Sequence, residues 1–310
     1  MSVSDSLRRW RERLFAGADP AARREVARLD EELAQLRHEL NELRGRPAAP
    51  PPDEAMAILA GRVEKLERLT VEHPEVASVT APHPAFPSPA VSVITPTWNR
   101  ADLVGAAIRS VQAQRFADWE MLVIDDGSTD NTEAVMAGFA ADPRVRFVRR
   151  EHAGQCAARN HALSIARGAI VAYLDSDNVW YPGYLAAAVA TYASRPEVDC
   201  AYGAMVTDAH WDKHILFEPF DRKRLEQANF IGMSTFSHRR ALYERFGGFD
   251  ETLTTLEDWD LILRYSQHAP AYRLPFLAVR YRVMDRKRVT VAQGRYLERD
   301  AATIRAKWTG

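Results

Sequence analysis

The chain has few of the features that mark secreted, membrane-spanning or nucleic-acid-binding proteins. Its 310 residues include only two cysteines, Cys156 and Cys200, too few for a disulfide framework. No run approaches the roughly 20 apolar residues of a membrane-spanning helix, and the N-terminal residues contain no apolar signal core. Because 41 Lys and Arg stand against 42 Asp and Glu, the basic excess typical of nucleic-acid-binding proteins is missing. We therefore expect a cytoplasmic protein without a nucleic-acid partner, at most peripheral to the inner face of a membrane.

Residues 1–73 are predicted to form a helical extension, because apolar residues recur there at alternating steps of three and four. The first such seam consists of Val26, Leu29, Leu33, Leu36, Leu40 and Leu43. A second, shorter seam consists of Met56, Leu59, Val63 and Leu66. Prolines between residues 47 and 52 interrupt the helix. The seams predict either a hairpin or a coiled coil that forms a homo-oligomer with another copy of the chain. An amphipathic helix packed on the main domain fits them equally well.

The fold class follows from the pattern after this extension. Residues 74–90 carry five prolines and are predicted to form a stiff linker. Beyond them, apolar strand-like runs alternate with helical segments. Strands are predicted at 91–94, 120–124, 145–148 and 170–174. Helices are predicted at 101–114, from a cap at 129–132 to residue 141, and at 157–166. This alternation predicts an α/β fold with a mainly parallel sheet flanked by helices.

Three polar segments each follow a predicted strand: Thr95–Arg100, Asp125–Ser128 and Asp175–Asn178. Because ligands of parallel sheets bind at the carboxyl ends of the strands, we expect the three segments to share one rim. Asp175 and Asp177 lie two residues apart, a spacing at which both carboxylates can face one target. Two like charges at that distance favour a cation between them, and their hard oxygen ligands suit Mg²⁺ or Mn²⁺. Taken alone, the pair is weak evidence, and an ordinary solvated turn is the favoured interpretation.

The first two segments have the chemistry of a nucleotide site. The indole of Trp98 can stack on a base and the guanidinium of Arg100 can reach a phosphate. The alternative is that Trp98 anchors the core and Asn99 caps a helix. Asp125 and Asp126 can accept hydrogen bonds from a base or from ribose hydroxyls. The remaining candidates in the first segment are Pro96, Thr97 and Asn99.

Two predicted helix starts supply further candidates. Gly154 and Gln155 open a helix whose free amides, together with Arg159, can meet an anion. Glu257 and Asp258 lie in the first turn of another predicted helix. Acids are favoured there by the helix dipole, whereas a catalytic role would have one carboxylate take the proton of an incoming hydroxyl. Spacing alone does not decide between these two interpretations.

Five ordered motifs resemble the signatures of family 2 glycosyltransferases. They are Val91–Arg100, Asp125–Asp130, Ala158–Asn160, Leu174–Asp177 and Glu257–Asp260. The resemblance covers roughly residues 91 to 290. It implies a GT-A fold and an inverting transfer from a nucleotide-diphosphate sugar, most often a uridine one, with a divalent metal. It divides the domain into a nucleotide-sugar-binding half (91–200) and an acceptor-side half (201–290), followed by a C-terminal helix (291–310).

The resemblance also implies roles for single residues. Trp98 lies near the base and Asp126 binds base or ribose. Asp175, with Ser176 and Asp177, forms the Asp-x-Asp element, in which Asp177 is the better candidate for direct metal contact. The resemblance makes Asp258 the general base, with Glu257 beside it contacting the acceptor or shaping the site.

The chain departs from the family pattern at three positions. Asn178 replaces an acid, His161 stands where a small residue is frequent, and Met284 stands where many members place a histidine that can serve the metal or diphosphate. Methionine is a poor ligand for a hard cation. The motifs favour a glycosyltransferase acting on a glycan or glycoconjugate, with residues 202–240 on the acceptor side. Met284 and the N-terminal seams leave open a non-catalytic, sugar-nucleotide-binding scaffold.

Overall fold

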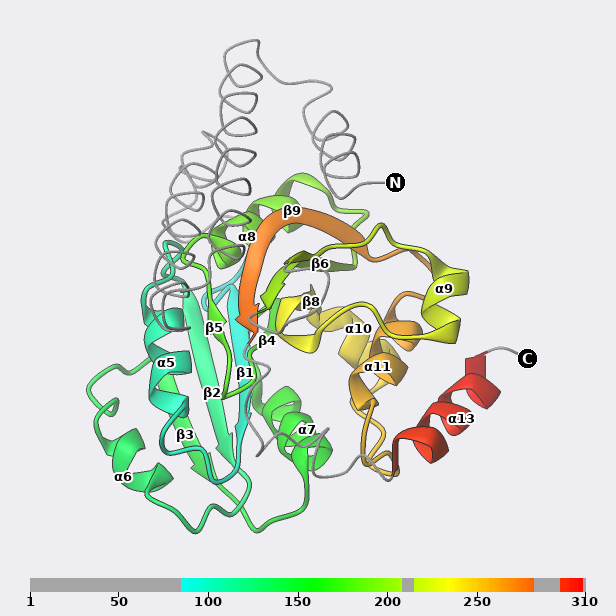
Figure 1. The fold of residues 1–310 in the computed structure, drawn as a ribbon. Coiled ribbons are helices and arrows are strands. Elements are labelled where there is room, and N and C mark those ends of the chain that lie inside the picture. The colour runs from blue at the N-terminus through cyan, green and yellow to red at the C-terminus, as the bar shows by residue number, and fades with distance from the viewer. Residues whose placement is uncertain (1–84, 208–214, 282–295, 309–310) are drawn as a thin grey trace, which may run out of the picture. The chain divides into compact units, whose positions relative to one another are not determined.

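One mixed β-sheet runs through the part of the chain that the computed structural model describes, residues 85–207, 215–281 and 296–308 (Figure 1). The strand order is β3-β2-β1-β4-β8-β6-β9-β5, and β7 pairs with β6. The strands are β1 (Val91–Thr97), β2 (Trp119–Asp125), β3 (Val145–Arg149), β4 (Ile170–Tyr173), β5 (Val179–Trp180), β6 (Cys200–Thr207), β7 (Ile215–Leu216), β8 (Phe236–Arg239) and β9 (Tyr272–Tyr281).

Helices pack on both faces of this sheet. They are α5 (Val104–Gln112), α6 (Thr132–Ala137), α7 (Gln155–Ile165), α8 (Tyr184–Ser194), α9 (Arg222–Gln227), the 3-10 helix η1 (Met233–Thr235), α10 (Arg240–Phe246), α11 (Glu257–Tyr265) and α13 (Leu297–Trp308). The predicted extension 1–73, most of the linker 74–90 and residue Met284 lie outside the described ranges.

The first half of the sheet is parallel. β1 lies between β2 and β4, with Val91 opposite Trp119 on one side and Ile170 on the other, and β2 also pairs with β3. Alternate side chains of β1 enter different cores. Val93 packs in the cluster that includes α5 and α8, whereas Ile94 packs in the cluster that includes α7 and α11. Because both faces are covered, every residue of β2 and β4 is buried, so buried residues follow one another there rather than alternating with exposed ones.

The second half of the sheet is mixed. β8 runs antiparallel to both β4 and β6, and β6 runs parallel to β9. In β8, Ser237 pairs with Ala172 of β4, so the short helix η1 just before β8 lies at the carboxyl end of β4. This pairing brings residues 233–235 to the rim on which the parallel strands end.

The strands predicted from the sequence at 91–94, 120–124, 145–148 and 170–174 are confirmed as β1 to β4. The helices α5 and α6 are shorter than predicted. Residues 101–103 form a turn before α5, and α6 ends at Ala137, one residue before Gly138, a poor helix former. The N-cap residue of α6 is Asn131, within the predicted cap, but its side chain makes no capping hydrogen bond. Asp130, the residue before it, accepts from the amide of Thr132 at 3.0 Å through Oδ1.

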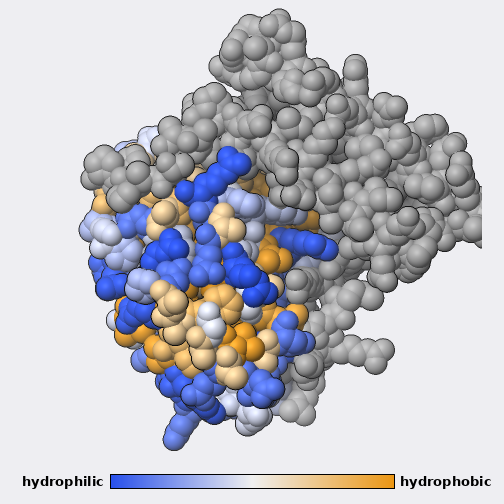
Figure 2. Space-filling view, turned by 90° about the vertical axis from the view of Figure 1, so that its left-hand side faces the viewer, coloured by the Kyte–Doolittle hydropathy of each residue, from blue (hydrophilic) through white to orange (hydrophobic). Residues whose placement is uncertain are grey.

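The face at the left of Figure 1, where α5 and α6 lie, carries a patch of hydrophobic residues bordered by hydrophilic ones (Figure 2). The helices α11 and α13 lie on the opposite side of Figure 1. None of the helices in the described ranges combines the length and apolar character that crossing a bilayer requires.

Candidate active site

The loops after β1 and β2 meet at one rim, as the sequence predicts. Thr97 and Asp125 are directly paired at the ends of the two strands, and the amide of Asp126 donates to the carbonyl of Thr97 at 2.9 Å. The third strand of the rim ends beside them, because the amide of Leu174 donates to the carbonyl of Ile94 at 3.0 Å. Parallel neighbours end on the same edge of a sheet, so three loops distant in sequence become one surface.

Asn99 fastens the first two loops to each other. Its backbone is left-handed, with φ of 52°, a conformation that asparagine tolerates better than most residues. Its side-chain Oδ1 accepts from the amide of Thr129 at 2.8 Å, and its own amide donates to Ser128 Oγ at 2.8 Å. Helix α5 begins only at Val104, so Asn99 joins two loops rather than capping this helix.

Asp125 and Asp126 are both buried, and each accepts hydrogen bonds from the chain. Asp125 Oδ1 accepts from the amide and the hydroxyl of Ser128 at 3.1 and 2.5 Å. Asp126 accepts from the amides of Ala153 at 2.9 Å and Gly154 at 2.8 Å. The carboxylate of Asp126 therefore holds the loop that leads into α7, at the position where the sequence predicts an anion-binding helix start.

Trp98 is 46% exposed and therefore does not anchor the core. Its indole stacks on the imidazole of His152, with ring centroids 4.6 Å apart and planes 22° apart. Nδ1 of His152 lies 2.8 Å from Asp126 Oδ2. The two rings form an exposed aromatic pair at the rim, suited to stacking with a further flat ring. His152 was not among the candidates, because no periodicity or motif in the sequence links it to Trp98.

The carboxylate of Asp175 is oriented by residues from two other segments. Its Oδ1 accepts from Arg159 at 2.8 Å and its Oδ2 accepts from the hydroxyl of Ser234 at 3.0 Å. Ser234 Oγ in turn accepts from the amide of Asp175 at 3.0 Å and from the side-chain amide of Asn178 at 3.2 Å. Sequence analysis did not select Ser234, which reaches Asp175 only because η1 and β8 add to the sheet beside β4.

Arg159 connects the rim to helix α11. One amino group of its guanidinium lies 2.8 Å from Asp175 Oδ1 and the other lies 2.6 Å from Glu257 Oε1. The side chain is only 4% exposed, and its Nε has no hydrogen-bond partner among the described residues. The anions that Arg159 meets in this structure are thus two carboxylates of the chain itself. Their charges raise the pKa of Arg159, against the effect of burial, so the guanidinium stays charged.

Asp258 lies in the first turn of α11, next to Glu257. Burial and the negative charge of Glu257 raise the pKa of the Asp258 carboxyl to about 7. Its Oδ1 accepts from the amide of Trp259 at 2.8 Å. Leu256, the residue before the helix, has a left-handed backbone with φ of 58°. A carboxyl with a pKa near neutrality is suited to accept a proton at physiological pH.

The carboxylates after β4, Asp175 and Asp177, are the candidate metal ligands. No cluster of three or more His, Cys, Asp or Glu side chains suitable for a metal occurs in the described ranges. Asp175 and Asp177, both half-buried, therefore do not form an all-protein cage. Mg²⁺ and Mn²⁺ that serve phosphate substrates commonly need only one or two carboxylates, with water and phosphate completing the shell. The two residues fit this sparser kind of site.

The described part of the 202–240 segment is mainly core. Phe217, Phe220 and Phe230 are half-buried against the second hydrophobic cluster, and His238 is fully buried. Nδ1 of His238 lies 2.8 Å from the carbonyl of Arg239, which can only accept, so Nδ1 carries the proton. Its Nε2 then accepts from the hydroxyl of Tyr173 at 2.8 Å. Residues 208–214 and 282–295, which include Trp211, His214 and Met284, lie outside the described ranges.

Comparison with known proteins shows the family of the chain. The family model described as glycosyl transferase family 2 matches residues 92–247, and the chain belongs to this family. It is 30% identical over 193 residues to a putative colanic acid biosynthesis glycosyl transferase, WcaA, of Escherichia coli K12, covering 57% of this chain and 66% of that protein. It is 44% identical over 91 residues to the E. coli β-1,3-glucosyltransferase WfgD, covering 29% and 36%. The chain thus spans less than two thirds of either relative.

A solved structure shows the same fold. Staphylococcus aureus TarS residues 1–349, in complex with UDP-GlcNAc, superposes with a TM-score of 0.57 at 20% identity, covering 64% of this chain and 60% of that one. The GT-A-type fold implied by the sequence motifs is therefore confirmed. At this identity the similarity concerns the fold alone.

Proposed function

We propose that the chain transfers a sugar from a nucleotide-diphosphate donor, a UDP-sugar, to a hydroxyl group of a glycan or glycoconjugate, with inversion at the anomeric carbon. The observation that carries this proposal is the bridge through Arg159. It sets Asp175, at the end of β4, opposite the pair Glu257 and Asp258 at the start of α11. A site for a donor diphosphate and a site for an acceptor base thus face each other across one buried guanidinium.

Asp258 is the proposed general base. Its carboxylate takes the proton of the acceptor hydroxyl as that oxygen attacks the anomeric carbon and the bond from this carbon to the diphosphate oxygen breaks. The raised pKa of Asp258 supports this role, because a base with a pKa near the working pH is strong enough to take a proton and is still about half ionised. Glu257 maintains the position of α11 through Arg159 and contributes the charge that raises the pKa of Asp258.

Asp175 and Asp177 are the proposed ligands of Mn²⁺ or Mg²⁺. Asp177, the second acid of the Asp-x-Asp element, is the better candidate for direct contact, as the family resemblance implies. Arg159 and Ser234 orient the carboxylate of Asp175. A bound cation would supply positive charge against the charge that develops on the departing diphosphate.

The nucleotide is proposed to lie along the first two loops, with its base near the aromatic pair of Trp98 and His152 and with Asp126 near base or ribose. Pro96, Thr97, Asn99, Arg100, Asp125, Gly154, Gln155 and Ser176 complete the proposed donor side. The donor half is proposed at 91–200 and the acceptor half at 201–290. A uridine nucleotide is supported by WfgD, whose name gives UDP-Glc as donor. A glycan acceptor is supported by the colanic acid function in the name of WcaA.

The test is to incubate the protein with a panel of UDP-sugars, Mn²⁺ and glycan acceptors and to detect the transferred sugar by mass spectrometry. We expect Asp258→Asn to lower transfer by about 10²- to 10⁴-fold while UDP binding is retained. Glu244→Gln is the matched control, because Glu244 is an exposed acid on α10 that pairs only with Arg240 at 3.3 Å among the described contacts. Full transfer by Asp258→Asn would show that the assigned base is wrong.

A non-catalytic scaffold would bind UDP without transferring a sugar from any donor of the panel. The features that motivate it, Met284 and the N-terminal seams, lie outside the described residues. The intact Asp175, Asp177 and Asp258 favour the enzyme.

A further inference from the structure

Helix α13 contacts the segment immediately before the proposed base. Asp300, only 1% exposed, directs one oxygen at this segment. Its Oδ2 accepts from the amides of Thr254 at 2.9 Å and Thr255 at 2.8 Å, and from the hydroxyl of Thr255 at 3.0 Å. Its Oδ1 is held from the other side by Arg299 at 2.7 Å. A carboxylate that accepts three bonds on one oxygen and faces a cation on the other has a fixed orientation.

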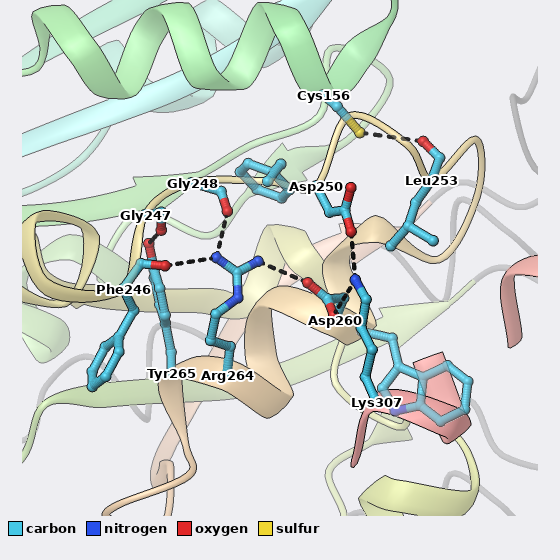
Figure 3. Close-up of polar contacts among 12 residues, drawn as sticks. Cys156, Phe246, Gly247, Gly248, Asp250, Leu253, Asp260, Arg264, Tyr265 and Lys307 are labelled. Atoms are coloured by element: carbon cyan, nitrogen blue, oxygen red, sulfur yellow. Dashed lines mark hydrogen bonds and ion pairs between the residues drawn. The ribbon is translucent and has the colours of Figure 1, made fainter. Parts of the chain in front are cut away.

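The same helix contacts α11 again, just after Asp258. Lys307 of α13 pairs with Asp250 and lies 3.4 Å from Asp260 Oδ1 (Figure 3). The indole of Trp308 donates to Asp260 Oδ1 at 3.1 Å. Along the chain, Asp258 therefore lies between two places that α13 contacts, residues 254–255 and Asp260.

Leu256, which lies between Thr255 and Glu257, has an unfavourable backbone conformation. Leu256 adopts φ of 58°, which is a strained conformation for a residue with a branched side chain and persists only where its surroundings hold it. The carbonyl of Leu256 accepts from the amide of Trp259 at 3.0 Å, so α11 begins directly from the strained residue. The direction of the first turn, and with it the position of Asp258, depends on what holds residues 254 and 255.

We propose that Asp300 is a positioning residue for the transfer reaction, which sets Asp258 in place by holding the backbone at Thr254 and Thr255. This inference rests on the proposed function for the role of Asp258. The contact of Asp300 differs from ordinary helix packing, because it is made to backbone amides two and three residues before Glu257 rather than to another helix. A displacement of about 1 Å at a catalytic group can cost up to 100-fold in rate, so such a contact acts on turnover more than on donor binding.

The test compares Asp300→Ala, which removes the contact, with Asp300→Asn, which keeps an oxygen able to accept from the two amides. Asp142→Ala is the matched control. Asp142 also accepts from a backbone amide, that of Arg144 at 3.1 Å, and from side chains, including Gln112 at 3.0 Å. If Asp300→Ala does not fold, Asp300→Asn and a second substitution, Asp300→Ser, carry the comparison.

The first measurement uses a probe that the chain already contains. Cys156 lies on α7 and is 5% exposed. Its thiol lies 3.7 Å from the carbonyl of Leu253, which belongs to the same loop as Thr254 and Thr255 (Figure 3). Cys200, 1% exposed, lies near Tyr265 and serves as an internal reference. We expect a thiol reagent to label Cys156 about tenfold faster in Asp300→Ala than in the wild type, with Cys200 unchanged. Wild-type labelling of Cys156 in the folded variant would overturn the proposal.

The second measurement is turnover. We expect kcat of Asp300→Ala to fall about tenfold or more, with the KM for the donor within about twofold, and Asp300→Asn to recover most of the loss. Unchanged kcat in a variant that labels rapidly would overturn the positioning role. If the wild type transfers no sugar from any donor, the proposed function fails, while the labelling of Cys156 still decides whether Asp300 holds the loop.

Discussion

Asp175 and Glu257 share one guanidinium, although one follows strand β4 and the other begins helix α11. Arg159 lies 2.8 Å from the first and 2.6 Å from the second, and its side chain is 4% exposed. Arg159 and Glu257 are buried and Asp175 is half-buried, so this group of three charges stays favourable only while all three are present. Removing the cation leaves two carboxylates close to each other with little water.

We expect Arg159→Leu to lower the free energy of unfolding by about 3–5 kcal/mol, because it leaves Asp175 and Glu257 without their shared cation. Adding Glu257→Gln should recover part of the loss, and the double-mutant cycle gives the coupling. Urea denaturation measures both.

Arg167→Ala is the control. Arg167 is 61% exposed and shares Glu120 with Arg146, so it should cost at most about 1 kcal/mol. Equal losses in the two arginine variants would contradict the bridge.

Transfer should depend on the ionisation of Asp258. Since its pKa is raised to about 7, the ionised base disappears below that pH. The rate at low substrate should therefore fall toward tenfold per pH unit on the acid side and level off above about pH 8. Glu257→Gln removes the neighbouring charge and should move the acid limb to lower pH. A profile of kcat/KM against pH for both proteins is the measurement. A limb that does not move in Glu257→Gln would show that another group controls it.

The exposed indole of Trp98 should contribute to nucleotide binding. Stacking of a base on an aromatic side chain is worth about 1–3 kcal/mol, so we expect Trp98→Ala to weaken UDP binding by about that amount. Trp98→Phe should retain most of the affinity. Calorimetric titration with UDP measures the change. The folded state should be little affected, because Trp98 is 46% exposed. Unchanged affinity in Trp98→Ala would place the base elsewhere.

Metal dependence should respond to Asp177. We expect EDTA to lower transfer and Mn²⁺ to restore it. Asp177→Asn should raise the Mn²⁺ concentration needed for half-maximal rate by about tenfold or more, because it removes a charged oxygen ligand. Asp221→Asn is a suitable control, since Asp221 caps α9 through the amide of Arg224 at 3.1 Å. A Mn²⁺ titration identical in Asp177→Asn and the wild type would argue against a role for Asp177 in metal binding.

His238 should make stability fall on acidification. Burial lowers its pKa from 6.5 to about 4, so between these values the unfolded chain binds a proton that the folded chain does not. Stability then rises with pH across this window and is lost as pH falls through it, by about 3 kcal/mol in total. Urea denaturation at pH 7 and pH 4.5 measures this. In His238→Gln the difference in the free energy of unfolding between pH 7 and pH 4.5 should be smaller by most of that amount. An identical pH dependence would exclude His238 as its source.

Much of the site could be predicted because its first parts are local in sequence. The ends of β1, β2 and β4 follow from apolar runs with polar residues directly after them, and parallel pairing sets these ends on one edge. The first turn of α11, with Glu257 and Asp258, begins close to the predicted helix start. Contacts from other segments were not visible in this way. His152 and Ser234 lie far along the chain from Trp98 and Asp175, and neither residue belongs to a periodic pattern.

The sequence by itself determined the strand–helix alternation, the order of the polar segments and the family. These features depend on periodicity and on short motifs, which local sterics and the alternation of side chains impose. Only the tertiary structure decided that Arg159 meets two carboxylates of its own chain, that Trp98 is exposed, and that Asp300 holds the backbone before Asp258. The physical reason is that these contacts depend on the position of β8 beside β4 and of α13 against α11. That arrangement is set by the packing of the whole hydrophobic core and not by the residues that make the contacts.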